Sequence, residues 1–212
     1  MKRSYSAEFL GTFQLVFIGT GSVLLVQTQQ WLYPQLWIGL AFGLAVFLGI
    51  MLFGKTSGAH MNPAVTIALW IKGVFSGKEV PFYLLFQCAG AIVASGLLAL
   101  IYPNHPHYGD TLPTAGIWES FGLEFGLTFI LMLGVIFDFY SKSSIWQAGL
   151  LIGAIVGLEA YFAGPYCGAS MNPARSLSPA VFSGLWTHIW IYLTATILGA
   201  IAAVLLLFKR MR

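Results

Sequence analysis

Residues 58–64 have the sequence GAHMNPA, and residues 168–174 have the sequence GASMNPA. The two stretches differ only where His60 is replaced by Ser170, and each places Asn before Pro-Ala and a short apolar stretch. Pro suits the first position of a helix, where its missing N–H is no loss, and Asn before it can cap the helix. One such triplet is an ordinary helix start, but two in matched heptapeptides indicate a repeated structural unit. We expect short helices over residues 63–72 and 173–183.

The composition indicates that both short helices belong to a membrane protein. Hydrophobic residues make up 58% of the chain, charged residues 8%, and the mean hydropathy is +0.82, which excludes an ordinary soluble domain. Stretches of about 20 apolar residues, long enough to cross a bilayer as helices, recur along the chain. The expected spanning helices cover about residues 5–28, 35–54, 81–102, 117–139, 146–163 and 185–208.

A second repeated motif shows how the halves are related. Residues 8–13, EFLGTF, return as residues 124–129, EFGLTF, at the start of the first and fourth spans. The chain is therefore a duplicated three-span unit, with repeats of about 1–108 and 115–212 in one domain of residues 1–212. Because each unit has an odd number of spans, the copies enter the membrane from opposite faces. We expect an all-α inverted repeat whose two short helices meet near the midplane.

The basic residues predict the orientation in the membrane. If the six spans alternate in direction, nearly all basic residues fall on one side, which the positive-inside rule assigns to the cytoplasm together with both termini. Arg175 is the exception and lies in the outer half. The residues on the basic side are Lys2, Arg3, Lys55, Lys72, Lys78, Lys142, Lys209, Arg210 and Arg212.

The paired triplets also predict a chemistry. Irregular backbone at membrane depth, here residues 56–61 and 164–171, is tolerated only when it is buried in protein or lines a wet cavity. If the Asn62 and Asn172 oxygens cap the short helices, their amide NH₂ groups are left as donors toward a lumen. Two helix N-termini also bring partial positive charge to the centre. Such a site interrupts a chain of hydrogen-bonded waters and repels cations.

These motifs resemble the aquaporins, the major intrinsic protein family, over essentially the whole chain. The resemblance lies in residues 7–12 (AEFLGT), 60–66 (HMNPAVT) and 170–176 (SMNPARS). It implies a right-handed bundle of six spans plus two half-helices, a pore in each protomer and a homotetramer in the lipid bilayer. The motif residues implied to form the pore centre are Asn62, Pro63, Ala64, Asn172, Pro173 and Ala174.

The resemblance further places an outer constriction at Phe42, Ala160, Ala169 and Arg175. The guanidinium of Arg175 offers several donors and a permanent charge, so it can bind polar solutes and repel cations. Strict water channels of the family usually carry His where this chain has Ala160. With Ala169 also small, we expect a wider and less polar constriction, because pore diameter and lining polarity set selectivity.

Other family markers are mixed. Ser176 and Ala180 are typical of water channels, whereas Tyr192-Leu193 lacks the Trp that water channels tend to have at the second position. The mixture resembles the nodulin-26-like and bacterial metalloid-permeable branch. It implies passage of water, glycerol, urea or undissociated arsenite, boric or silicic acid, with exclusion of protons and ions. A strictly water-selective channel is the alternative.

Three buried acids are interpreted as supports for the pore loops. Glu8 and Glu124 occupy matched positions, and we expect each to accept N–H groups of the loop before its Asn-Pro-Ala triplet. Glu159 is expected to brace the second loop or to serve as a counter-charge to Arg175. His60 either narrows the pore or is a satisfied loop histidine. The residues expected to line the pore beside the triplets are Gly58, Ala59, His60, Gly168 and Ser170.

Two other classes of protein share some of these features. A secondary transporter also has inverted repeats and broken helices, but no ion-binding carboxylate is expected near the central site. An intramembrane enzyme would need paired acids, a Ser/His dyad or a metal cluster, and the sequence indicates no catalytic residue, metal site or cofactor. Nucleic acid is not an expected partner. The expected location is the plasma (inner) membrane of a prokaryote.

Overall fold

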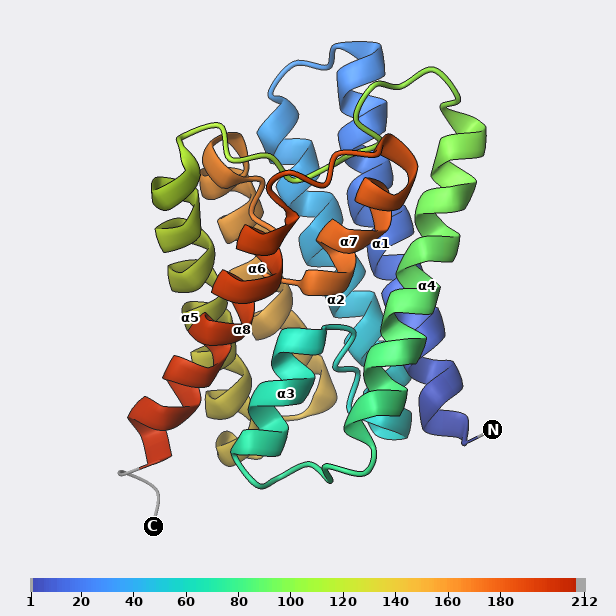
Figure 1. Ribbon diagram of the computed structural model, residues 1–212. Helices are drawn as coiled ribbons and strands as arrows, with labels where there is room; N and C mark the ends of the chain where they lie inside the picture. Colours follow the sequence, from blue (N-terminus) through green and yellow to red (C-terminus); the bar gives the residue numbers. More distant parts are fainter. Residues whose placement is uncertain (1, 209–212) are drawn as a thin grey trace.

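The computed structural model describes residues 2–208, and these residues form a bundle of helices without strands (Figure 1). Six of the helices are long and apolar enough to cross a membrane, as predicted. Two shorter helices, α3 and α7, begin at the prolines of the Asn-Pro-Ala triplets. The helices are α1 (Arg3–Gln29), α2 (Pro34–Ser57), α3 (Pro63–Ile71), α4 (Val80–Ile101), α5 (Ile117–Ser141), α6 (Ile145–Cys167), α7 (Pro173–Ser183) and α8 (Ile189–Phe208).

Three helix boundaries differ from the prediction by more than two residues: the C-terminal ends of α2 and α6 and the start of α8. The second span was expected to end at residue 54, but α2 continues to Ser57. The predicted fifth span ended at residue 163, yet α6 continues through Pro165 to Cys167. The carbonyls of Pro165 and Tyr166 accept hydrogen bonds from the Thr114 hydroxyl at 2.6 and 2.8 Å, so this turn is held from outside the helix. The last span begins at Ile189 rather than residue 185, because Gly184 ends α7 in a left-handed conformation and a turn follows.

The packing of the helices follows the repeat. Helix α1 packs against α4 in the first half, α5 packs against α8 in the second, and α2 meets α6 across the junction of the halves. Helix α3 enters the bundle from the face where the N-terminus lies, and α7 enters from the opposite face (Figure 1). The predicted all-α inverted repeat with two half-helices is confirmed.

Glycines allow α2 and α6 to approach closely where the two halves join. A Cβ atom on Gly43 would lie 2.8 Å from the Gly153 carbonyl oxygen, and one on Gly153 would lie 2.7 Å from the Gly43 oxygen. Gly39 and Gly157 form a second reciprocal pair one turn away, with distances of 2.6 and 2.9 Å. Small residues at such a crossing allow dense packing between membrane helices. The reciprocal pattern is what a two-fold axis between α2 and α6 requires.

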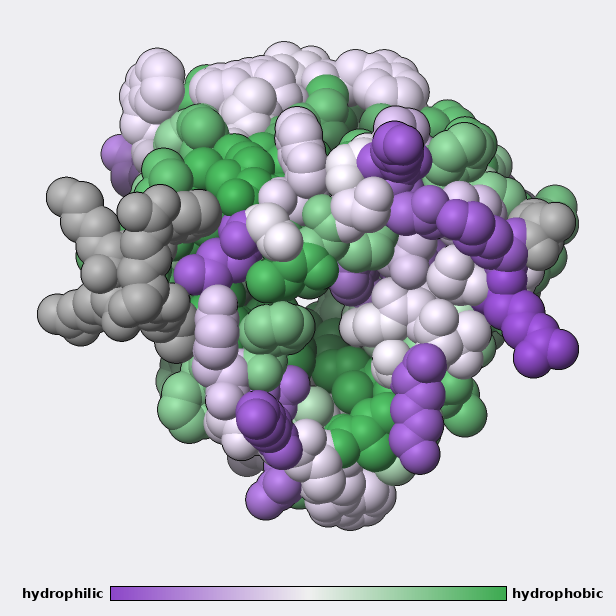
Figure 2. All heavy atoms as spheres, turned by 90° about the horizontal axis from the view of Figure 1, so that it is seen from below, coloured by the Kyte–Doolittle hydropathy of each residue, from purple (hydrophilic) through white to green (hydrophobic). Residues whose placement is uncertain are grey.

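Charged side chains gather on the face from which α3 enters. Figure 2 shows hydrophilic residues distributed around a central hollow on this face. Lys55 in the last turn of α2 and Lys78 before α4 belong to this end of the bundle. Lys209, Arg210 and Arg212, which the sequence also assigned to this side, lie outside the described residues.

Candidate functional site

The two Asn side chains cap the half-helices as predicted. Asn62 Oδ1 accepts the Ala64 backbone N–H at 2.9 Å, and Asn172 Oδ1 accepts the Ala174 N–H at 3.0 Å. Both asparagines are in extended backbone conformation, and both are buried. Because each Asn Oδ1 is held by its own half-helix as an N-cap, the local sequence Asn-Pro determines the direction in which each side-chain amide points.

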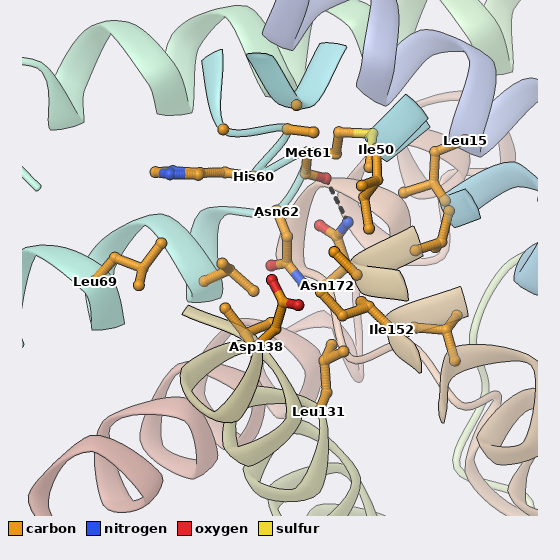
Figure 3. A pocket seen from close by; sticks show the side chains of 18 of the residues that line it. Leu15, Ile50, His60, Met61, Asn62, Leu69, Leu131, Asp138, Ile152 and Asn172 are labelled. Atoms are coloured by element: carbon orange, nitrogen blue, oxygen red, sulfur yellow. Dashed lines mark hydrogen bonds between the residues drawn. The ribbon is translucent and has the colours of Figure 1, made fainter. Parts of the chain in front are cut away.

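The two caps are joined to each other by crossed hydrogen bonds. Asn62 Nδ2 donates to the Met171 carbonyl at 2.7 Å, and Asn172 Nδ2 donates to the Met61 carbonyl at 2.8 Å, the latter drawn in Figure 3. An amide NH₂ group carries two donors, so one N–H of each Asn remains for the lumen. The sequence predicted the lumenal donors but not the crossed bonds that orient them.

Each loop before a triplet adopts the same unusual backbone. Ala59 and Met61 have φ values of 47° and 48°, and Ala169 and Met171 have φ values of 42° and 54°. Side-chain-bearing residues rarely occupy this left-handed region, and such strain persists only where the surroundings impose it. The two pore loops are therefore held in place by contacts outside themselves.

Glu8 and Glu124 supply those contacts. Glu8 accepts the His60 and Met61 backbone N–H groups at 3.0 and 2.7 Å. Glu124 accepts the N–H groups of the matched residues, Ser170 and Met171, at 2.8 and 2.9 Å. Both acids are fully buried. This arrangement matches the support role that the sequence predicted for them.

Gln87 is a support residue that the sequence analysis missed. Its Nε2 atom donates to Glu8 Oε2 at 2.7 Å and to Thr66 Oγ1 at 2.9 Å, and the side chain is fully buried in α4. A Gln in an otherwise apolar span carries a buried amide that must find partners. The presence of Gln87 in an apolar span could therefore have identified this residue from the sequence.

A cavity of about 430 Å³ runs past the crossed asparagines (Figure 3). Much of its wall is apolar and comes from α1, α2, α5 and α6, including Leu15, Val46, Ile50, Leu131 and Ile152. Among the residues predicted to line a pore, the cavity wall includes Gly58, Ala59, His60, Asn62, Ser170, Asn172, Phe42 and Arg175. The predicted residues that are not part of that wall are Pro63, Ala64, Ala160, Gly168, Ala169, Pro173 and Ala174.

Arg175 marks the end of the cavity opposite the charged face. Its Nη1 atom donates to the Gly109 carbonyl at 2.9 Å, and its guanidinium carbon lies 5.3 Å from the centre of the Phe42 ring. Ala160 and Ala169 are buried in the same apolar cluster as Phe42. The structure therefore places Phe42, Ala160 and Ala169 in one cluster. The guanidinium of Arg175, the fourth predicted constriction residue, lies over the Phe42 ring.

The loop that holds Arg175 also carries an acid. Asp110 follows Gly109, and one of its carboxylate oxygens is buried without a hydrogen-bond partner in residues 2–208. Burial raises the pKa of Asp110 above its ordinary value, while the nearby charge of Arg175 opposes that rise. The sequence analysis did not single out this acid.

Both interpretations of His60 are compatible with the structure. The side chain lines the cavity, and its Nδ1 atom lies 3.1 Å from Thr66 Oγ1. The ring also packs at 4.7 Å from the ring of Phe75 and at 5.1 Å from the ring of Tyr83. His60 is thus held by its neighbours on one side and faces the cavity on the other.

Neither role expected of Glu159 is present. Both of its carboxyl oxygens are buried without a hydrogen-bond partner in residues 2–208, so the side chain does not brace the second loop through a hydrogen bond. It also makes no ion pair with Arg175 within that range. Glu159 is also not part of the cavity wall. Its place beside Ala160 in the sequence suggested a contact that helix geometry does not allow.

Opposed half-helices in an inverted repeat, capped toward one cavity and joined at their tips, define a membrane channel protein. The family model described as major intrinsic protein matches residues 1–207 of the chain. It belongs to this family. The predicted integral membrane channel for water and small neutral solutes, rather than an enzyme, is confirmed by that membership.

The relatives also confirm the branch. The chain is 40% identical over 200 residues to aquaporin NIP1-1 of Zea mays, covering 92% of this chain and 70% of the relative. It is 39% identical over 198 residues to nodulin-26 of Glycine max, covering 92% and 73%. The solved aquaglyceroporin of Plasmodium falciparum superimposes with a TM-score of 0.90 at 27% identity, covering 98% of this chain and 95% of that one.

Proposed function

We propose that this channel conducts glycerol, urea and undissociated metalloid hydroxides such as arsenite, boric or silicic acid in addition to water. The observation that carries the proposal is the makeup of the outer constriction. Phe42 and Arg175 line the cavity with large side chains, whereas Ala160 and Ala169 lie in the apolar cluster behind that wall and carry only methyl groups. With no bulky side chain at these two positions to enter the cavity, room is left beside Phe42 and Arg175 for solutes larger than water. The similarity to an aquaglyceroporin supports the same conclusion.

Exclusion of protons and cations is assigned to the crossed asparagines and Arg175. Each Asn presents its remaining N–H to a passing water, which must then accept at the centre and cannot relay a proton through that point. Two half-helix N-termini and one guanidinium add positive potential along the path. The residues proposed to act here are Asn62, Asn172 and Arg175.

The same crossed bonds argue against the transporter alternative. Alternating access requires one half of the protein to move against the other around the central site. Asn62 binds the Met171 carbonyl and Asn172 binds the Met61 carbonyl, so such a movement would break buried hydrogen bonds at the tips of both half-helices. A static path is therefore favoured.

The quaternary structure and orientation follow the family resemblance and the charges. We propose a homotetramer with one pore in each protomer and with both termini in the cytoplasm. The basic residues on the face where α3 enters support this orientation. The prokaryotic plasma membrane stays a prediction, since the relatives compared above come from plants and Plasmodium and give it no support.

The test is stopped-flow light scattering of proteoliposomes under gradients of water, glycerol, urea and arsenite, with Ala160→His in parallel. The wild type should pass the solutes, and the imidazole should reduce their passage while water continues to flow. A strictly water-selective wild type, unaffected by the substitution, would contradict the proposal. Saturable, gradient-coupled uptake would instead indicate a transporter.

A further inference from the structure

The cavity contains one acid that the family motifs do not account for. Asp138 lies near the end of α5, on the side of the charged face, and its side chain projects into the cavity (Figure 3). Its Oδ1 atom is buried and has no hydrogen-bond partner in residues 2–208. Within the same range Asp138 forms no ion pair, although Lys55 lines the same cavity. The side chain therefore brings a carboxylate to the wall of the cavity, with Oδ1 covered and Oδ2 not among the buried atoms without a partner.

At the centre and outer end of the path, three side chains supply hydrogen-bond donors. Asn62 and Asn172 present N–H groups, and Arg175 presents a guanidinium. Between these groups and Asp138 the wall is largely apolar, with Leu131 and Val135 on the same helix as the acid. Among the described residues of the cavity wall, Asp138 is the only carboxylic acid.

A carboxylate in that place selects for a particular chemistry. A carboxylate can only accept hydrogen bonds. A buried carboxylate oxygen is more stable when a solute donates a hydrogen bond to it than when it has no donor. Polyols and urea carry donors on two separate atoms, which match the two oxygens of one carboxylate, whereas both hydrogens of water are on one oxygen and cannot both form well-aligned bonds to the same carboxylate. A solute with adjacent O–H or N–H groups therefore gains more from Asp138 than one water does.

We propose that Asp138 is a specificity-determining residue of the channel, which accepts hydrogen bonds from small uncharged solutes with adjacent O–H or N–H donors in the inner half of the cavity. Arg175 binds acceptor atoms of the solute at one end of the path, and Asp138 binds donor atoms at the other. The inference rests on the proposed passage of solutes other than water.

The experiment compares Asp138→Asn and Asp138→Leu with the wild type in proteoliposomes, measuring water, glycerol and urea permeability in each preparation. Asn keeps one acceptor oxygen of similar shape, and Leu keeps the volume without an acceptor. The matched controls are Glu119→Gln and Glu119→Leu, because Glu119 is an exposed acid on the same helix that does not line the cavity. Water permeability in each preparation shows whether the pore has assembled.

The ratio of glycerol to water permeability should fall roughly tenfold in Asp138→Leu, as expected for the loss of one hydrogen bond to a charged group, and less in Asp138→Asn. The Glu119 variants should keep the wild-type ratio.

If the wild type passes glycerol and Asp138→Leu keeps the wild-type ratio of glycerol to water permeability, this inference alone is overturned. A wild type that passes only water contradicts both the inference and the proposed function. If Asp138→Leu loses water permeability as well, the Asp138→Asn ratio decides: a decrease supports the inference, and no decrease overturns it.

Discussion

Gln87 donates a hydrogen bond to the buried carboxylate of Glu8 over 2.7 Å, and residues 115–208 of the second half contain no equivalent bond from a side-chain amide. The matched acid, Glu124, accepts the N–H groups of its own pore loop and interacts with the Cys167 thiol. At the position that corresponds to Gln87 in α8 stands Thr196, whose hydroxyl donates to the Tyr192 carbonyl of the same helix. The two pore loops share one backbone conformation but are supported differently.

Replacement of Gln87 by Leu should therefore destabilise the first loop. Glu8 would keep its two backbone donors but lose the third, and a buried charged acceptor without its partner costs about 1 to 3 kcal/mol. We expect a lower midpoint of thermal unfolding in detergent and reduced water permeability. Gln27→Leu, at an exposed position of α1, is the control and should leave both quantities near the wild-type values. Equal effects from the two substitutions would contradict the role of Gln87.

Glu159→Leu should stabilise the protein. The carboxyl group is buried without a hydrogen-bond partner in the described chain, and leaving a polar group in that state costs about 1 to 3 kcal/mol. Leu fills a similar volume and removes the cost. The midpoint of thermal unfolding should rise, and water permeability should not change, because Glu159 does not line the cavity. A loss of stability would show that the side chain has a partner that the geometry does not reveal.

Gly19→Ala should disturb the outer constriction. A Cβ atom on Gly19 would overlap the Phe42 ring, which would have to move away from the Arg175 guanidinium. We expect altered glycerol and water permeability together with a lower yield of folded protein. Gly122→Ala on α5 is the control, because nothing lies within 4 Å of its added Cβ, and Ala favours a helix by up to about 1 kcal/mol over Gly. Normal permeability in Gly19→Ala would mean that Phe42 does not set the constriction.

Asn62→Asp should admit cations. The substitution removes the N–H that donates to the Met171 carbonyl and places a negative charge at the centre of the path. Water permeability should fall, and a sodium or proton leak should appear in proteoliposomes loaded with an ion-sensitive dye. Asn104→Asp, in the exposed connection between α4 and α5, adds the same charge outside the cavity and should cause no leak. If both variants stay ion-tight, the central donors do not carry the exclusion of cations.

Most of the fold could be predicted from the sequence, because its strongest signals are local or periodic. Six apolar stretches set the spans, Pro63 and Pro173 set the starts of the half-helices, and duplication set the inverted topology. The extension of α6 through Pro165 was missed, since it depends on hydroxyl and amide groups donated by a distant loop. The last carbonyls of a helix have no partner within the helix, and here groups of that loop satisfy the carbonyls of Pro165 and Tyr166.

The sequence allowed prediction of those site residues that occupy matched positions in the two halves of the repeat. Glu8 and Glu124 were assigned to the loops because their motifs match, and the hydrogen bonds follow that assignment. Gln87 and Asp138 occur in one half only, so the comparison of the halves could not single them out. Glu159 was misjudged because adjacency to Ala160 in the chain places its side chain on a different face of the helix.

The crossed bonds between Asn62 and Met171, and between Asn172 and Met61, make each half of the chain depend on the other. A single three-span unit would have its Asn amide and its loop carbonyl at the tip of a half-helix, with neither group satisfied inside the bilayer. Neither half can therefore satisfy its own polar groups alone, and each completes the membrane-embedded tip of its inverted counterpart.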